Sequence, residues 1–296
     1  MRLASTIQKL NLLRIIRPLA RLGLFNWIPD EIYLQAVFFC SLGYRLNLKN
    51  PITFNEKLQW LKLNDKREEM CLYVDKLRAR ELVEKEIGPE YLIPLLGVYK
   101  AIEEISWEQL PKQFVIKCTH GCGCNIICRD KDNFDVEKAK KKLRKWLRRN
   151  WYGYGREWPY KHLQPMIIIE KFMQENITDY KFMCFHGEPK LIQVHQNRNT
   201  PNYTLDFYDA NWERSTIKRR NKAPGKEIQK PLCLTEMLDI ARRLSRNDLH
   251  VRIDLYEVNG RVYFGEKTYY AASGFSPFAD YEDDKLLGSW IRLPSE

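Results

Sequence analysis

Residues 116–128 concentrate side chains that could perform chemistry, because four cysteines, one histidine and two glycines fall within this short segment. Cys118, Cys122, Cys124 and Cys128 follow the spacing C-x3-C-x-C-x3-C. Structural zinc sites usually combine two C-x2-4-C pairs that lie well apart in the sequence. The spacing therefore argues against a zinc or redox centre, and the alternative is a chance cluster of buried, reduced thiols.

The same segment also fits a loop that holds phosphates. An apolar strand ends in Lys117, and Gly121 and Gly123 follow before the apolar pattern resumes. Glycines let backbone N–H groups approach an anion, and a lysine adds a point charge. The spacing matches neither a P-loop nor a GxGxxG turn, so an ordinary β-hairpin with two glycines is the alternative.

Two further stretches carry charged residues on expected strands. MIIIEKFM predicts a buried strand ending in Glu170 and Lys171, which either holds the base and ribose of a nucleotide or is simply a solvated strand end. RIDLYEVNGRVYFGE predicts a hairpin with Asp254 on its first strand and Glu266 on its second.

The loop length of this hairpin decides whether its two acids meet. A two-residue Asn-Gly turn places Asp254 opposite Gly265 and turns Glu266 to the other face. A three-residue turn that includes the preceding valine places Glu266 on the face of Asp254, displaced diagonally by roughly 7–8 Å. Such carboxylates could hold Mg²⁺ ions that bridge phosphates, and the alternative is two surface acids.

The elements around these motifs predict a mixed fold. Thr53 and Glu56 form a capping box that starts one helix, and Thr235 is expected to cap another. Residues 135–150 show the clearest helical pattern, with an apolar stripe from Val136 to Trp146 among eight Lys or Arg residues. DYKFMCFHGEPKLIQV predicts a strand, a tight turn and a second strand. Helices mixed with hairpins indicate an α+β fold with largely antiparallel sheets.

Composition and charge limit the class of partner. The chain has 296 residues, 44% of them hydrophobic, which is enough for one large or two ordinary domains. Its formal net charge of +11 favours nucleic acid, acidic lipid, nucleotide or a polyanionic substrate. No apolar run approaches the ~18 residues of a membrane-spanning helix. Basic residues interrupt any signal-peptide core, so we expect a cytoplasmic protein with reduced thiols.

Residues 1–50 are expected to form a basic, helical N-terminal segment. Five Lys or Arg residues precede the first acid, Asp30. Between residues 12 and 22 a helix would place three arginines on one face and aliphatic side chains on the other, with a kink at Pro18. Two interpretations stay open: a helix packed on its own domain, and an interfacial helix at the inner face of the plasma membrane.

The order of these parts resembles that of the ATP-grasp superfamily, and more closely that of its TupA-like group. The stretches that carry the resemblance, in order between residues 51 and 294, are FNEKLQWLKL, EYLIPLLGVY, FVIKCTHGCGCNIIC, GREWPYK, DYKFMCFHGEPKLIQV, VRIDLY and VYFGEKTYYAASGF. The resemblance implies an ATP-grasp region over residues 51–296 whose two α+β subdomains, 51–172 and 173–296, clasp ATP between antiparallel sheets. The group is associated with teichuronopeptide-type and other bacterial surface polysaccharide clusters.

The resemblance also implies roles for the matching residues. Those expected to bind the nucleotide, including the glycines of a flexible lid, are Lys117, His120, Gly121, Gly123, Asn125, Glu170 and Lys171. Lys181 would contact a phosphate or acyl phosphate, and Asp254 and Glu266 would bind Mg²⁺; these three form the expected catalytic set. Thr268 stands where the superfamily often has Asn, so it would be a weaker third ligand to the metal.

The implied activity is that of an ATP-dependent carboxylate–amine ligase. ATP would phosphorylate a carboxylate, and an amine would attack the acyl phosphate. The implied substrates are an amino acid or small amine and a uronic-acid carboxylate of a surface glycan or its precursor, with no nucleic acid. One alternative is a glycosyltransferase, for which the sequences at Asp209 and Asp283 are poor metal motifs. The other is a basic nucleic-acid-binding module, which lacks a recognition motif.

Overall fold

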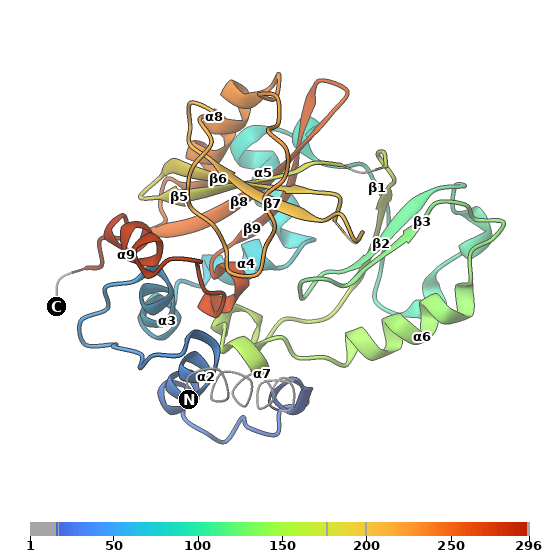
Figure 1. Ribbon diagram of the computed structural model, residues 1–296. Coiled ribbons are helices and arrows are strands. Elements are labelled where there is room, and N and C mark those ends of the chain that lie inside the picture. The colour runs from blue at the N-terminus through green and yellow to red at the C-terminus, as the bar shows by residue number, and fades with distance from the viewer. Residues whose placement is uncertain (1–15, 17, 176, 199, 295–296) are drawn as a thin grey trace.

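Two antiparallel sheets form the framework of the computed structural model, which describes residues 16, 18–175, 177–198 and 200–294 (Figure 1). The larger sheet has the order β7-β6-β5-β8-β9 and the smaller one the order β1-β4-β2-β3. The strands of the larger sheet are β5 (Asp179–Phe185), β6 (Glu188–Gln196), β7 (Thr204–Tyr208), β8 (His250–Val258) and β9 (Arg261–Thr268). Those of the smaller sheet are β1 (Leu95–Tyr99), β2 (Phe114–Cys118), β3 (Asn125–Cys128) and β4 (Ile167–Lys171). The predicted α+β class with antiparallel sheets is confirmed.

Helices surround both sheets. The α-helices are α2 (Asp30–Leu42), α3 (Phe54–Asn64), α4 (Glu69–Val74), α5 (Arg78–Ile87), α6 (Val136–Leu147), α7 (Tyr152–Gly155), α8 (Leu234–Ser245) and α9 (Tyr281–Ser289). Single turns of 3-10 helix lie at Pro89–Tyr91, Ile102–Glu104, Trp107–Gln109, Trp158–Tyr160 and Ala271–Gly274. None of the helices in the described part of the chain is long and apolar enough to cross a membrane.

The main apolar core belongs to the larger sheet and draws on distant parts of the sequence. Phe182 of β5 and Ile253 of β8 are fully buried beside Met237 of α8. Phe54 and Val83, from α3 and α5, join the same core although these helices precede the smaller sheet in the sequence. The division expected at residue 172 therefore separates the strands of the two sheets, but α3–α5 pack with the second sheet.

A separate core holds the smaller sheet against α6. Ala139 and Leu143, two members of the predicted apolar stripe, pack against Phe114 and Ile116 of β2. Asp135 caps the helix by accepting a hydrogen bond from the Lys138 backbone N–H at 2.8 Å. The charged residues of α6 remain outside this core, so the helix presents a basic surface on its exposed sides.

One of the two predicted helix caps is confirmed and the other is wrong. Thr53 and Glu56 form the expected capping box, with Thr53 Oγ1 accepting from the Glu56 N–H at 3.2 Å. Thr235 does not cap α8, because the helix begins one residue earlier, at Leu234. The Leu234 N–H bonds to the Pro231 carbonyl at 3.2 Å, which starts the first turn before Thr235.

The β8–β9 hairpin has a two-residue turn, so the three-residue turn that would align its acids is wrong. Val258 pairs with Arg261 across the turn. The turn residues Asn259 and Gly260 have φ angles of 54° and 70°, the left-handed geometry that a tight hairpin turn requires.

A β-bulge aligns the acids instead. Leu255 pairs with Phe264, but the next pair is Asp254 with Glu266, so Gly265 is the extra residue. A Cβ on Gly265 would lie 2.9 Å from the Tyr256 ring and 3.0 Å from the Asp254 carbonyl oxygen. Glycine therefore permits the bulge, and the bulge places the two acids directly opposite one another.

The predicted amphipathic helix of residues 12–22 lies largely outside the described residues. Within the described part, residues 18–21 are helical, and a small apolar cluster joins Ala20 to Leu34 and Phe38 of α2. The cluster also includes Phe275, which follows β9 by only a few residues. The N-terminal region thus packs on the rest of the protein.

The buried ring of His250 should make the stability of the larger core depend on pH. Its ring lies 4.9 Å from that of Phe54 and 4.7 Å from that of Phe185, and Nδ1 bonds to the Cys184 carbonyl at 2.9 Å. Burial lowers the pKa of His250 from 6.5 to about 3. Between these values the unfolded chain takes up a proton that the folded chain excludes, so stability falls as pH falls, by about 1.4 kcal/mol per pH unit. Urea unfolding across this range should show a shallower pH dependence for His250→Asn, and parallel curves would contradict the assignment.

Candidate active site

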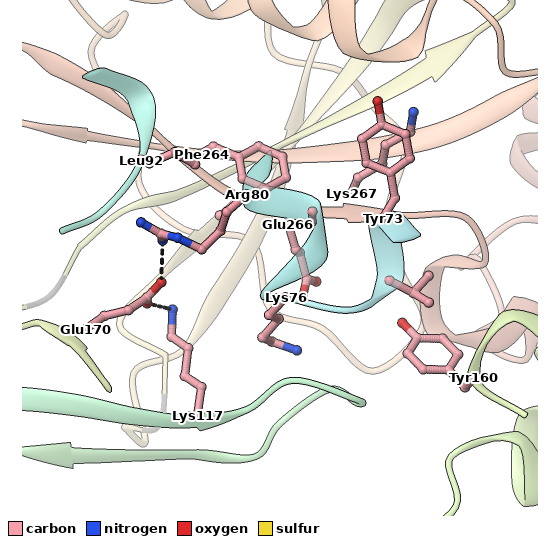
Figure 2. Close-up of a pocket in the computed structure, with 13 residues that line it drawn as sticks. Tyr73, Lys76, Arg80, Leu92, Lys117, Tyr160, Glu170, Phe264, Glu266 and Lys267 are labelled. Carbon is pink, nitrogen blue, oxygen red and sulfur yellow. Dashed lines mark hydrogen bonds and ion pairs between the residues drawn. The ribbon is translucent and has the colours of Figure 1, made fainter. Parts of the chain in front are cut away.

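The candidate site lies where the two sheets meet helices α4 and α5. One pocket there is lined by Lys76, Arg80, Lys117, Glu170 and Glu266, among others (Figure 2). A second pocket, of about 210 Å³, shares Lys117 and Glu170 with the first. It continues along residues 171–175 and also includes Asn125, Arg198 and Tyr256. The two pockets therefore adjoin at the ion pair of Lys117 and Glu170.

Two cations converge on Glu170 at the smaller sheet. Lys117 Nζ lies 2.5 Å from Glu170 Oε2, and Arg80 Nη1 lies 3.1 Å from Oε1 (Figure 2). Val115 pairs with Glu170 between β2 and β4, which places Lys117 two residues farther along the neighbouring strand. Because one carboxylate balances two cations, this side of the pocket keeps an excess of positive charge that suits phosphates.

The larger sheet places a row of charged side chains across three strands. Lys181 of β5 pairs in register with Asp254 of β8, which pairs with Glu266 of β9. Lys181 Nζ contacts Asp254 Oδ2 and lies 3.0 Å from Asp179 Oδ2. The three residues expected to form the catalytic set are therefore neighbours.

Arg252 joins this row and was missed by the sequence analysis. Its Nη2 atom lies 2.9 Å from Asp254 Oδ2, 2.8 Å from Glu266 Oε1 and 3.1 Å from Thr268 Oγ1. One positively charged nitrogen thus sits among oxygens of all three residues expected to bind the metal. The signal was present in the sequence, because Arg252 stands two residues before Asp254 and so shares its face of the strand.

The oxygen set fits a hard divalent cation. Carboxylate and hydroxyl oxygens are ligands that Mg²⁺ accepts, and the guanidinium nitrogen marks a position where they already surround positive charge. The described residues contain no cluster of three His, Cys, Asp or Glu that could hold a metal. The set here has two carboxylates, and its third oxygen is a threonine hydroxyl. The Asp254 side chain is 1% exposed and that of Glu266 33%, so Glu266 opens the set toward the pocket.

Burial and nearby charges act differently on the two acids. Burial raises the pKa of Asp254 to about 6, although Arg252 and Lys181 oppose the shift. Burial would also raise the pKa of Glu266, but Arg252, Lys181 and Lys76 together hold it well below its usual value. Glu266 is therefore a carboxylate that faces cations from both sides of the pocket.

The glycine loop between β2 and β3 is held by two contacts. Lys76 Nζ donates a hydrogen bond to the Gly121 carbonyl, and the Lys76 N–H donates to the Thr119 carbonyl at 3.0 Å. A Cβ on Gly121 would overlap the Trp151 indole, whereas one on Gly123 would meet nothing within 4 Å. Glycine is favoured at position 123 for a different reason, because the backbone φ there is +69°, in the left-handed region.

The expected nucleotide-binding residues fall into three groups. Lys117, Asn125, Glu170 and Lys171 line the pockets. Gly121 and Gly123 lie in the adjacent loop. His120 lines neither pocket; its buried ring faces α6, where Nε2 lies 3.2 Å from the Trp146 carbonyl. The sequence analysis did not predict Lys76 and Arg80 as site residues. The pattern that could have indicated them is the run of cations in DKLRAR, residues 75–80.

The four cysteines of this segment do not meet at one point, although the Cys118 and Cys124 thiols are hydrogen-bonded to each other. Cys118, Cys124 and Cys128 belong to the core between the smaller sheet and α6, whereas Cys122 is exposed at the tip. Although the residue is exposed at the surface, neighbouring atoms partly desolvate the Cys122 thiol, and together with Glu157 and Glu266 this raises its pKa to about 11. A thiol with a raised pKa is a poor metal ligand and a poor nucleophile at neutral pH.

A cation-lined glycine loop on one sheet and paired acids on the other, with pockets between them, define the ATP-grasp class. A model of the family described as TupA-like ATPgrasp matches residues 56–292. Because this match covers most of the chain, the chain belongs to the TupA-like ATP-grasp family. The predicted family is thus confirmed, and the prediction of an ATP-grasp ligase is confirmed at the level of the family.

Solved structures of several ligases resemble this chain. An L-amino acid ligase from Bacillus licheniformis matches with a TM-score of 0.46 and 13% identity, over 83% of this chain and 55% of that one. A D-alanine–D-alanine ligase from Helicobacter pylori matches with a TM-score of 0.43 and 15% identity, over 81% and 69%. The ATP complex of the Bacillus anthracis D-alanine–D-alanine ligase matches with a TM-score of 0.41 and 14% identity, over 67% of this chain and 55% of that one. The chain thus spans little more than half of the Bacillus anthracis enzyme, and no curated protein matches it by sequence.

We expect position 121 of the glycine loop to accept no side chain larger than that of glycine. Gly121→Ala should displace the loop, because the added methyl group overlaps Trp151, and ATP affinity measured by calorimetry should fall at least tenfold. Gly123→Asn is the matched control, since Asn tolerates a left-handed φ and has open space there. Gly121→Ala combined with Trp151→Ala should recover affinity, and failure to recover would rule out the steric explanation.

We expect replacement of Arg252 to lower the stability of the metal-free protein and to increase its stabilisation by Mg²⁺. In Arg252→Met, the Asp254 and Glu266 carboxylates lose their shared cation, so the protein should melt at a lower temperature in EDTA than the wild type. Added Mg²⁺ should restore more stability to this variant than to the wild type, because it replaces the missing charge. Thermal melts with and without Mg²⁺ measure both effects, and an equal Mg²⁺ response in the two proteins would exclude this oxygen set as the metal site.

Proposed function

We propose that the protein is an ATP-dependent carboxylate–amine ligase that works through an acyl phosphate. The observation that carries the proposal is the cluster of Lys181, Arg252, Asp254, Glu266 and Thr268, whose member Glu266 lines the same pocket as Lys117. Family membership supports the ATP dependence. The reaction joins a carboxylate and an amine, and consumes one ATP to activate the carboxylate.

The protein's own residues would act mainly by positioning and by neutralising charge. Bound Mg-ATP supplies the phosphoryl group that the substrate carboxylate accepts, with ADP as the leaving group. Lys117 and Lys76 would hold phosphate oxygens from the smaller sheet and its lid. Asp254, Glu266 and Thr268 would hold Mg²⁺. Once its carboxylate partners turn to the metal, Arg252 would be available for the anionic substrate.

In the second step, the amine nitrogen attacks the acyl carbon, phosphate leaves, and the nitrogen loses a proton. The amine must reach the acyl carbon in a site that excludes water, since water would hydrolyse the acyl phosphate. Tyr160 lines the pocket, and the loop carrying Cys122 contacts another lining residue, Lys76, through the Gly121 carbonyl. These elements are suited to shielding the intermediate.

We further propose that the carboxylate belongs to a uronic acid of a bacterial surface polysaccharide or its precursor, and that the amine is an amino acid or another small amine. The net charge of +11 supports an acidic acceptor. Because ATP is available in the cytoplasm, we place the reaction there.

The glycosyltransferase alternative loses its weak sequence support. Asp209 Oδ1 accepts hydrogen bonds from the Asn211 and Glu213 N–H groups at 2.9 and 2.8 Å, so Asp209 stabilises a turn. Asp284, next to Asp283, accepts from the Asn55 N–H at 3.0 Å. Asp209 therefore stabilises a local turn and Asp284 a contact between α3 and α9, so both motifs are engaged in structural hydrogen bonds.

The test is ADP release with an amine and a uronic acid supplied. Asp254→Asn and Glu266→Gln keep side-chain size but remove one charge each, so turnover should fall by orders of magnitude with a smaller loss of ATP affinity. The double variant should be little worse than the worse single variant, because both acids serve one metal.

Asp239→Asn, on the exposed side of α8, is the matched control and should keep wild-type turnover. Wild-type turnover and unchanged Mg²⁺ dependence in Asp254→Asn and Glu266→Gln would refute the assignment of the site. Turnover of UDP-sugars without ATP would instead favour the glycosyltransferase.

A further inference from the structure

A groove of about 830 Å³ lies between residues 18–26 and helix α6, away from the pockets of the candidate active site. Its lining among the described residues includes six cations and no acid; the cations are Arg21, Lys141, Arg144, Lys145, Arg148 and Arg149. Those of α6 follow helical spacing, so they form one face of the helix. The nearest recorded counter-charge is Glu103, which lies 3.8 Å from Arg144. This face is therefore an almost uncompensated band of positive charge.

Residues 22–27, which border the groove at Leu22, Gly23 and Asn26, expose large apolar side chains. Leu22 is 76% exposed, Leu24 54% and Trp27 80%, all within six consecutive positions. The Trp27 indole N–H donates to the Leu24 carbonyl at 3.1 Å, so the ring can leave water without losing its hydrogen bond. Exposed aromatic and aliphatic side chains gathered beside cations are typical of surfaces that enter the interfacial region of a bilayer.

Arg156 holds in place the segment that carries these apolar side chains. Arg156 is buried, and its Nη1 donates to Asn26 Oδ1 at 2.9 Å while Nη2 donates to the Phe25 carbonyl at 2.5 Å. Its guanidinium also stacks on the Tyr33 ring at 4.2 Å. Because the backbone at Phe25 and Asn26 is fixed, the exposure of Leu24 and Trp27 is a property of the fold.

We propose that this surface, defined by Leu22, Leu24, Trp27 and the cations of the groove, docks on an anionic lipid bilayer. The apolar side chains enter the level of the headgroups, and the α6 cations contact lipid phosphates. A soluble polyanion would satisfy the cations but leave Leu22, Leu24 and Trp27 in water, which is why the structure favours a bilayer. The proposal does not depend on the ligase reaction.

The test is flotation of the full-length protein with vesicles of phosphatidylcholine, with and without phosphatidylglycerol, in the absence of nucleotide. The wild type should float only with the anionic vesicles and should detach as salt rises. Lys145→Gln with Arg148→Gln should weaken partitioning about thirtyfold, since each cation near an anionic surface contributes about fivefold. Leu22→Ser should weaken it roughly tenfold through lost apolar burial.

Two controls match these changes on a distant surface. Lys226→Gln with Lys230→Gln removes the same two charges from exposed positions, and Leu232→Ser removes an apolar side chain that is 89% exposed. Both should float as the wild type does. Equal losses in the test and control variants would overturn the proposal, because net charge or general hydrophobicity would then explain binding.

Binding of soluble polygalacturonate tests whether the groove binds an acidic polymer rather than an anionic bilayer. The bilayer proposal expects polygalacturonate to bind weakly and Leu22→Ser to affect vesicles alone. Tight binding of polygalacturonate that is unaffected by Leu22→Ser, together with poor flotation of the wild type, would make the groove a polymer site and overturn the proposal.

Discussion

The buried charges on β5, β8 and β9 constrain the rest of the structure. Arg252, Asp254 and Lys181 have little access to water, and a buried charge is costly unless its partners are in place. Their pairing requires strand register to be correct across three strands at once. A slip of one residue in β9 would turn Glu266 to the opposite face and remove one of the two carboxylates that Arg252 contacts. The bulge at Gly265 is therefore a condition for this arrangement of charges.

The two sides of the pocket are electrostatically unlike. The smaller sheet contributes Lys117, the segment before α5 contributes Lys76, and α5 contributes Arg80. Glu170 is the shared counter-charge of Lys117 and Arg80. The larger sheet contributes acids whose charge is balanced by Arg252 and Lys181. A ligand that carries both phosphates and a divalent cation complements this polarity, because its anionic part faces the first side and its cation the second. The polarity also favours one orientation of such a ligand.

Local features of the fold could be predicted from the sequence, and long-range ones only in part. The capping box of Thr53 and Glu56 and the basic helix α6 depend on neighbouring residues, so their patterns are complete within a few positions. The bulge at Gly265 has no such pattern, because a glycine in a strand is compatible with several structures. That Asp254 and Glu266 share a face was reached by the wrong turn geometry, and Arg252 was overlooked since an arginine beside acids is usually a surface residue. The packing of α3–α5 on the second sheet depends on contacts far apart in sequence, which no local signal encodes.

The position of the smaller sheet within the chain has a consequence for folding. Val83 of α5 and Phe182 of β5 belong to one core, although β1–β4 and α6 lie between them in the sequence. Closing that core therefore means closing a loop of roughly a hundred residues, which has an entropic cost that compaction of the loop reduces. The smaller sheet has its own apolar core with α6, so its early collapse would bring the ends of the intervening segment together. We expect the smaller sheet to act as an internal folding template, whose formation speeds assembly of the larger sheet around the active site.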